Sequence, residues 1–264
     1  MVRRPPPVLT PPRRRRRRAG AGTLAVAAPL VALAYFLAAP ALPELPAGDT
    51  TILVAGAVGL LMLAASTLAL LPAEATLFGP LLVASGAGLL AAALNSDGEA
   101  GVGAGANVAE ALVAGSIGLL FARWLATPVI AIAVPLFVAA IDVWSVASGP
   151  SSQLLADGTE VIDPLSFDFP AWGNGESAGH LGFSDALFLS MFAAWAWHYG
   201  FRRKTTIAGL TLGLVASLVL GLVFDEAIPA LPLVAAGYLL PNLDRIGAML
   251  HHEQPAAGVP TERG

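Results

Sequence analysis

The sequence predicts an all-α, polytopic helical membrane protein, and three observations support this fold class. The chain of 264 residues is 56% hydrophobic and only 12% charged, with a mean hydropathy of +0.73. Apolar runs of about 20 residues recur along it, and each is long enough to cross a bilayer core of about 30 Å. Lipid leaves only helices or closed barrels as spanning structures, and the alternating pattern of a barrel is absent. Because the chain has no cysteine, disulfides, thiolate metal sites and cysteine catalysis are excluded.

Eight apolar segments are expected to span the membrane. They are residues 19–43, 50–72, 76–95, 105–126, 128–148, 178–199, 205–226 and 228–250. Pro128 and Pro229 open the fifth and the eighth segment, where a missing N–H group is tolerated. The chain thus divides into a disordered basic leader at 1–18, N-terminal helices at 19–126, a second group of helices at 127–250 with a loop at 149–178, and a tail at 251–264.

The basic residues predict how these spans are oriented. Eight of the fourteen lie in the leader, and the other six are Arg123, Arg202, Arg203, Lys204, Arg245 and Arg263. With eight spans and an internal N-terminus, all of them fall on the cytoplasmic side, as the positive-inside rule requires. The loop at 149–178 has five acidic and no basic residues, and it falls outside. We therefore expect a multi-pass cell-membrane protein with both termini in the cytoplasm, in which the N-terminal Arg cluster determines topology or binds anionic lipid.

Two aspartates, Asp142 and Asp185, interrupt otherwise apolar segments. A carboxylate inside a membrane span is costly and marks a candidate site whose partner has to be named. Asp142 is six residues short of the outer end of its segment, and Asp185 is seven residues past the outer start of the next. At ~1.5 Å per residue, both lie roughly 10 Å below the outer edge. Two antiparallel neighbours would bring these carboxylates together, so we expect each to be the partner of the other.

Small residues and prolines accompany this pair. Gly182, three residues before Asp185, leaves a bare patch on the same face of its helix. The run from Pro229 to Pro232 begins the eighth segment at the same level, and we expect it to leave free carbonyl groups that are buried in protein or face a wet cavity. Two carboxyl groups about 3 Å apart share one proton. One can then take a proton from water while the other polarises a peptide carbonyl, which is aspartic protease chemistry. It needs no metal or cofactor, and the sequence offers no ligand cluster for one.

These residues resemble the motifs of the presenilin and signal peptide peptidase family of intramembrane aspartyl proteases, in a prokaryotic form. That family has an aspartate in a Tyr-Asp motif, a second in Gly-x-Gly-Asp, and a downstream Pro-Ala-Leu. Here Asp142 matches the first, Gly182-Phe183-Ser184-Asp185 the second and Pro229-Ala230-Leu231 the third, at intervals of 43 and 44 residues. The resemblance implies that Asp142 and Asp185 are the catalytic pair. It also implies that the other residues of the second and third motifs contact the substrate.

The chain departs from the family pattern in three ways. Ile141 stands where the family has tyrosine, Ser184 replaces the second glycine, and we find eight spans where the family typically has nine. The outer position of the loop at 149–178 resembles the signal peptide peptidase branch. It implies substrates that are transmembrane or leader peptides with a cytoplasmic N-terminus, and no nucleic-acid partner is expected.

Two other functions remain open at this point. A catalytically silent homologue that binds membrane segments is compatible with the Ser184 departure. A proton- or cation-coupled transporter also uses paired intramembrane carboxylates, but it predicts internal repeats with matching broken helices, and the sequence shows no convincing repeat.

Three further features have two interpretations each. His180 either tunes the aspartate pair or is an ordinary interfacial residue. Glu110 either gates the substrate or extends to the outer interface. Leu165, Phe167 and Phe169 alternate with polar residues, which indicates either a short strand that pairs with a substrate or a loop cap with buried aromatic side chains.

Overall fold

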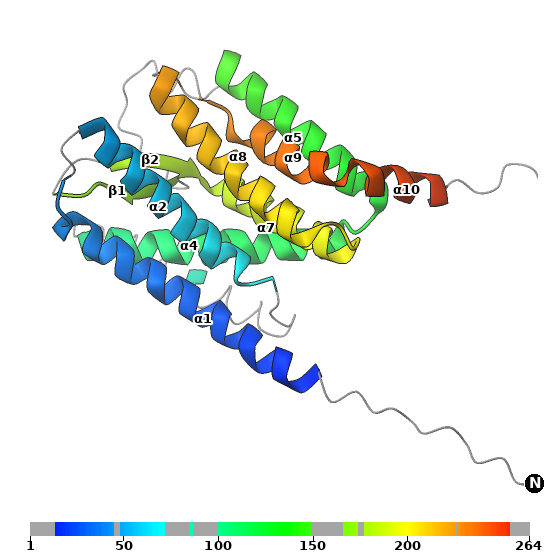
Figure 1. Ribbon diagram of the computed structural model, residues 1–264, viewed down its shortest axis with the longest axis horizontal. Helices are drawn as coiled ribbons and strands as arrows, with labels where there is room; N and C mark the ends of the chain where they lie inside the picture. Colours follow the sequence, from blue (N-terminus) through cyan, green and yellow to red (C-terminus); the bar gives the residue numbers. More distant parts are fainter. Residues whose placement is uncertain are drawn as a thin grey trace, which may run out of the picture.

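The computed structural model describes residues 14–44, 48–71, 85–86, 100–148, 166–173, 177–224, 226 and 228–253. Its long helices are α1 (Arg14–Ala38), α2 (Gly48–Leu68), α4 (Ala100–Trp124), α5 (Pro128–Ser148) and α8 (Arg203–Phe224) (Figure 1). The shorter elements are η1 (Ala39–Ala41), β1 (Ser166–Pro170), β2 (Ser177–Gly182), α7 (Phe183–His198), α9 (Ala230–Leu239), η2 (Leu240–Asn242) and α10 (Leu243–Glu253). The predicted third span at 76–95, apart from Ser85 and Gly86, lies outside the described residues.

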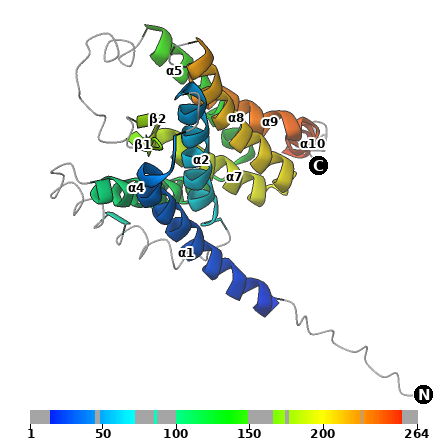
Figure 2. The same ribbon diagram turned by 60° about the vertical axis from the view of Figure 1, so that its left-hand side comes forward.

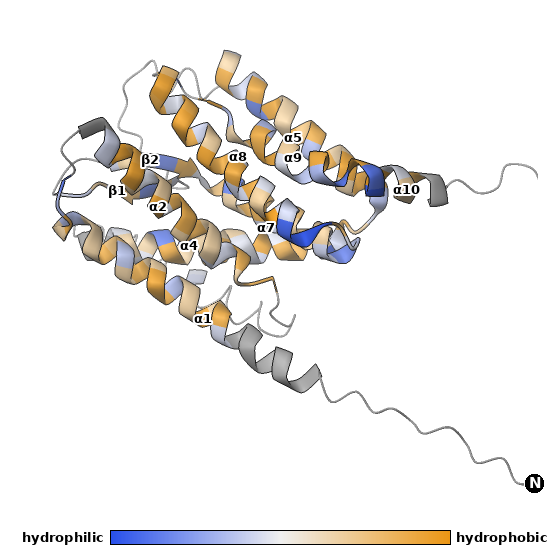
Figure 3. Ribbon diagram, in the orientation of Figure 1, coloured by the Kyte–Doolittle hydropathy of each residue, from blue (hydrophilic) through white to orange (hydrophobic). Residues whose placement is uncertain are grey.

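Within the described residues, five helices are long and apolar enough to cross a membrane. Their apolar windows are 23–41, 50–68, 103–124, 128–148 and 203–224. They coincide with the predicted first, second, fourth, fifth and seventh spans, and Figure 3 shows hydrophobic residues along most of their length. This result supports a helical multi-pass membrane protein.

Two other predicted spans have a different structure. The segment 178–199 begins as strand β2, and its helix α7 starts only at Phe183 and has 16 residues. Gly179 in this strand has a φ of 128°, which a residue with a Cβ rarely adopts. The segment 228–250 is divided into α9, η2 and α10, because Pro241 cannot donate to the preceding turn and its ring disfavours a regular helix there.

The helices form a bundle with α5 at one edge. In both views α5 lies beside α9, and α1 lies on the opposite side of the bundle (Figures 1 and 2). The start of α1, the α7–α8 turn and α10 lie toward one end, and the β1–β2 hairpin lies toward the other. The elements that carry Asp142, Asp185 and Pro229 thus come together around α9.

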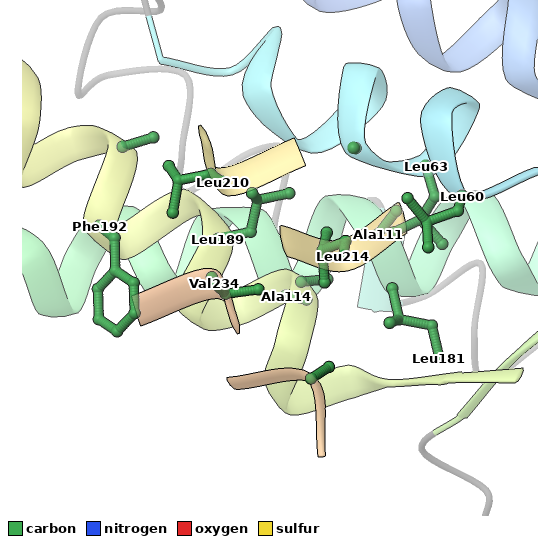
Figure 4. Close-up of a cluster of buried hydrophobic side chains, with 14 of the residues drawn as sticks. Leu60, Leu63, Ala111, Ala114, Leu181, Leu189, Phe192, Leu210, Leu214 and Val234 are labelled. Carbon is green, nitrogen blue, oxygen red and sulfur yellow. The ribbon is translucent and has the colours of Figure 1, made fainter. Parts of the chain in front are cut away.

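The core lies between α2, α4, α7, α8 and α9. Figure 4 shows its centre, to which these five helices and β2 contribute. Leu189 and Phe192 of α7, Leu214 of α8 and Val234 of α9 are fully buried there. Inside a bilayer such contacts stabilise by close packing rather than by removing surface from water. The core therefore fixes α7, which carries Asp185, against its neighbours.

Glycines bring the backbones of α8 and α9 unusually close together. A Cβ atom built on Gly213 would lie only 2.6 Å from the carbonyl oxygen of Leu233, and one on Gly209 would clash with the carbonyl of Gly237. Gly209 and Gly213 are four residues apart, the spacing by which small residues let two membrane helices approach. The contact sets the position of α9 and of its first residues, Ala230 and Leu231.

The two strands form an antiparallel hairpin in which Phe167 pairs with Leu181 and Asp168 with His180. Phe167 and Phe169 are fully buried, whereas the side chains of Asp168 and His180 are exposed. Both interpretations of the alternating segment therefore hold in part, because residues 166–170 form a strand and bury its aromatic side chains. Leu165 lies outside the described residues.

An asparagine from α4 closes the outer edge of this hairpin. The buried Asn107 donates from Nδ2 to the carbonyl oxygen of Asp168 at 2.6 Å and accepts from its N–H at Oδ1 at 3.1 Å. The amide thus satisfies the two backbone groups that a neighbouring strand would otherwise bind. Asn107 thereby ties β1, the partner of the strand that precedes α7, to the helix bundle.

Replacing Asn107 with alanine should lower the free energy of unfolding by about 1–3 kcal/mol, because two backbone groups of Asp168 lose their partner. Asn107→Asp keeps an acceptor for the N–H of Asp168 and should lower the free energy of unfolding by less. Thermal unfolding in detergent micelles measures both. Equal midpoints for the alanine variant and the wild type would contradict this role.

A polar cluster joins the α7–α8 turn to the end of α9. The backbone N–H of Arg202 donates to Oδ1 of the buried Asn242 at 2.9 Å, and its guanidinium donates to both carboxylate oxygens of Asp244 at 2.7 and 2.9 Å. Asn242 also donates to Oγ1 of Thr206 at 2.8 Å. Asp244 therefore lies beside the α7–α8 turn, and the polar cluster begins at Asn242, within the segment 228–250 that was predicted as one apolar span.

The ion pair with Arg202 should make stability depend on pH in the acidic range. Hydrogen bonds from Arg202 lower the pKa of Asp244, so its unfolded-state pKa of about 3.9 is the higher one. The pair therefore stabilises the fold above about pH 4, and this contribution disappears as the pH falls through the folded-state pKa. Asp244→Asn should lower the thermal midpoint at neutral pH, and the difference from wild type should vanish on acidification. A difference that persists below the folded-state pKa would contradict the assignment.

Candidate active site

The two aspartates line one cavity, although they come from different elements. Asp142 belongs to α5 and Asp185 to α7, and the cavity between them has a volume of about 320 Å³. The two carboxylates are close enough to interact electrostatically. The equal depths of the two residues in the sequence predict this proximity. The full lining consists of Leu60, Asp142, Val146, His180, Leu181, Asp185, Ser217, Leu218, Gly221, Leu222, Glu226, Ile228, Pro229 and Ala230.

Asp185 lies in the first turn of α7 rather than in the middle of a span. Gly182 is the residue before the helix, and its N–H donates to Oδ2 of Asp185 at 3.2 Å. The aspartate thus reaches back to the first residue of its own helix, as in half of a capping box. A Cβ on Gly182 would lie 3.3 Å from this same oxygen. The glycine therefore leaves room for the carboxylate at the change from strand to helix.

Asp142 binds the first turn of a different helix. Its Oδ2 accepts a hydrogen bond from the backbone N–H of Leu231 at 2.9 Å. Leu231 is the second residue of α9, whose first N–H groups have no partner inside the helix. The Pro-Ala-Leu run therefore offers an N–H donor to the site, whereas the sequence reasoning expected only free carbonyl groups from it. The reason is that this run starts a helix, which exposes donors at its N-terminus.

The remaining motif residues relate to the cavity in three ways. Pro229 and Ala230 line the cavity. Leu231 is buried and takes part through its backbone, whereas Phe183 packs on the core and Ser184 is exposed. Neither Phe183 nor Ser184 belongs to the cavity lining. The serine that replaces the second glycine of the motif therefore lies beside the site rather than in it.

Helix α8 supplies a wall that the sequence reasoning missed. Ser217, Leu218, Gly221 and Leu222 all line the cavity. The only sequence signal was Gly221, a small residue near the outer end of a predicted span. A motif search does not find such residues, since they carry no reactive group and matter only for the shape of the cavity.

The two weaker acid–base candidates lie in different places. His180 lines the aspartate cavity from β2, with its Nδ1 at 3.6 Å from Oδ1 of Asp168. Glu110 is buried and lines a separate cavity of about 360 Å³ beside β1. The structure thus brings His180, but not Glu110, to the aspartate pair.

The site offers two carboxylates, each anchored by a backbone N–H at the start of a helix. In both residues this bond uses Oδ2, and within the described part of the chain Oδ1 has no hydrogen bond. The described residues contain no group of three or more His, Asp or Glu side chains that could hold a metal ion. The arrangement suits chemistry in which a water molecule and a carbonyl group bind between two carboxyl groups.

Comparison with known proteins adds nothing to this geometry, since no family model, curated protein or solved structure matches the chain.

Proposed function

We propose that the chain is an intramembrane aspartyl protease that hydrolyses peptide bonds within transmembrane or leader-peptide segments. The observation that carries this proposal is the cavity itself. It gathers an aspartate of α5, an aspartate of α7 and the first residues of α9, three motifs that are more than forty residues apart in sequence. Their order and spacing resemble those of the presenilin and signal peptide peptidase family.

The proposed reaction uses the two carboxyl groups as a pair that shares one proton. The ionised carboxylate takes a proton from a water molecule, whose oxygen attacks the carbonyl carbon of the peptide bond. The protonated carboxyl group donates a hydrogen bond to the carbonyl oxygen and stabilises the charge that develops there. Collapse of the tetrahedral intermediate breaks the C–N bond, and the amine leaves with a proton from the pair. Oδ1 of each residue is the atom available for these transfers, because Oδ2 accepts a backbone N–H.

The hairpin next to Asp185 supports a way of presenting the substrate. Because Asp168 turns its N–H and carbonyl toward Asn107, His180 opposite it turns its own N–H and carbonyl away from β1. His180 also lines the cavity, so this edge of β2 lies next to the aspartates. An unwound substrate segment could pair with this edge of β2 as an added strand. Such pairing would place a peptide bond of the substrate next to the two aspartates.

The proposed topology has eight spans, with both termini in the cytoplasm and the hairpin on the outer side. All described basic residues from Arg123 onward lie at helix ends or turns of one side in this arrangement. Substrates with a cytoplasmic N-terminus would then be favoured, as in the signal peptide peptidase branch. The proposal includes the lipid bilayer and transmembrane peptides as partners.

A cleavage assay in liposomes tests the function. Purified wild-type protein, Asp185→Asn and Glu110→Gln would each receive a labelled single-span peptide inserted in either orientation. Products cut within the apolar segment by the wild type and by Glu110→Gln, but not by Asp185→Asn, would support the protease. Glu110→Gln is the matched control, since it changes a buried acid to its amide in the other cavity.

The same assay separates the alternative functions. A wild type that binds the peptide without cutting it would favour the silent homologue, for which the Ser184 departure is the sequence argument. A peptide-independent proton flux abolished by Asp185→Asn would favour a transporter.

A further inference from the structure

A second kind of site lies at the opposite end of the bundle from the hairpin. Its cavity has a volume of about 270 Å³ and lies where α2, α4 and α7 end. It is lined by Leu71, Leu119, Ala122, Arg123, Ala126, Ala194, Trp197 and His198. Five of these residues are apolar and small or aliphatic, and three carry a cationic or aromatic polar group. None of them belongs to the aspartate cavity.

The walls of this cavity are held in place by identifiable contacts. Trp195 of α7 is buried and donates from Nε1 to the carbonyl oxygen of Ala122 at 3.0 Å, which joins α7 to α4 beside the cavity. Trp197 lines the cavity, and the guanidinium of Arg203 lies 3.8 Å from the centre of its ring. The stacked arginine restrains this indole and adds positive charge near the cavity.

Among the described residues, this end of the bundle carries mainly positive charge. Figure 3 shows a hydrophilic stretch at the α7–α8 turn, which contains Arg202, Arg203 and Lys204. Among the described side chains, the acid close to this turn is Asp244, and Arg202 already binds both of its carboxylate oxygens. A ligand with a negative charge would therefore meet an excess of positive charge here.

We propose that this cavity binds the headgroup of an anionic phospholipid, with its phosphodiester next to Arg123 and His198. The guanidinium of Arg123 and an imidazole N–H of His198 are suitable donors for phosphate oxygens. The apolar wall formed by Leu71, Leu119 and Ala194 suits the glycerol and the start of an acyl chain. The exposed Trp124 and Trp197 mark the level of the headgroups, where tryptophan is enriched. Basic pockets between membrane helices on the cytoplasmic side are the usual binding sites of such headgroups.

Lipid rather than free phosphate is the occupant that the walls favour. An inorganic ion would be satisfied by the cationic groups alone and would leave the aliphatic wall unused. The site does not depend on the proposed proteolysis, so its test and that of the protease have separate outcomes. Because α7 forms one wall and carries Asp185 at its other end, a bound lipid would also restrain this helix.

The test compares lipids on the full-length protein in neutral detergent micelles. Short-chain phosphatidylglycerol, phosphatidylcholine and inorganic phosphate are titrated separately, and retained lipid is measured by native mass spectrometry. Both lipids present a phosphodiester, but choline adds a cation that Arg123 and Arg203 repel, so we expect phosphatidylglycerol to bind about tenfold more tightly than phosphatidylcholine. Arg123→Gln should remove this preference, and Arg123→Lys should keep most of it. Lys204→Gln also removes one positive charge at this end of the bundle, but outside the cavity. It should change the preference for phosphatidylglycerol by less than about twofold.

Several results would overturn the proposal. Equal affinity of the wild type for both lipids would show that the site does not recognise an anionic headgroup. If Lys204→Gln lost the preference for phosphatidylglycerol as fully as Arg123→Gln does, general surface charge would explain the binding. Competition by inorganic phosphate alone at equal concentration would identify a free anion instead of a lipid. If Arg123→Gln does not fold, Ala126→Phe fills the cavity from the α4–α5 turn without removing charge. Retained phosphatidylglycerol preference in that folded variant would equally contradict the site.

Discussion

Asp142→Asn is expected to lower peptide hydrolysis by about a thousandfold or more while leaving the fold nearly as stable as that of the wild type. Asparagine cannot ionise, so one of the two carboxyl groups needed to move the proton of water is lost. Its amide oxygen can still accept the N–H of Leu231, which Oδ2 of Asp142 accepts at 2.9 Å. Cleavage of a single-span peptide in liposomes measures the first effect, and thermal unfolding measures the second.

Asp142→Ala separates the chemical role from the structural one. Alanine removes both the carboxylate and the acceptor for the start of α9, so activity should be lost and the free energy of unfolding should fall by about 1 kcal/mol as well. Activity that survives in Asp142→Asn would exclude the proposed dyad. Equal stability of the two variants would instead contradict the contact between α5 and α9.

Gly237→Ala should destabilise the fold by about 3 kcal/mol, the second large effect that we expect. A Cβ at Gly237 would clash with the carbonyl of Gly209 and lie 2.8 Å from the backbone nitrogen of Leu210. Backbone atoms cannot rotate away as a side chain does, so α8 and α9 would have to separate. Leu231 lies six residues before Gly237 on the same helix, about 9 Å along its axis. Hydrolysis should therefore fall together with the unfolding midpoint.

Gly247→Ala is the matched control for this substitution. Gly247 also lies in a helix, α10, but a Cβ there would meet no atom within 4 Å. The same change should therefore stabilise the protein by about 0.5–1 kcal/mol through helix propensity alone. If both variants raise the unfolding midpoint, the close contact between α8 and α9 is not present in the folded protein.

The membrane-spanning character of the chain could be predicted from sequence because it is a local property. About 20 consecutive apolar residues suffice to define a span, and each of the five long helices is such a run. Counting residues along two antiparallel segments also predicted that Asp142 and Asp185 come together, and both line one cavity. Neither prediction needed knowledge of which helices are neighbours.

The predicted span at 178–199 shows where this reasoning ends. Its first five residues are apolar enough to extend a helix, yet they belong to β2, because β1, which ends seven residues before β2 begins, pairs with this strand. Asp185 consequently lies at the start of a helix, where Gly182 donates to it. Pairing between strands depends on partners elsewhere in the chain, which hydropathy along one segment does not reveal.

The sequence by itself determined the apolar helices, the two aspartates within apolar segments and the order of the three motifs, since these depend on residue type and spacing alone. Only the tertiary structure decided that Leu231 binds Asp142, that α8 lines the cavity, and that Arg123 and His198 share a second cavity. These features join residues from different helices. Their formation depends on the approach of whole backbones, which glycines such as Gly209 and Gly237 permit.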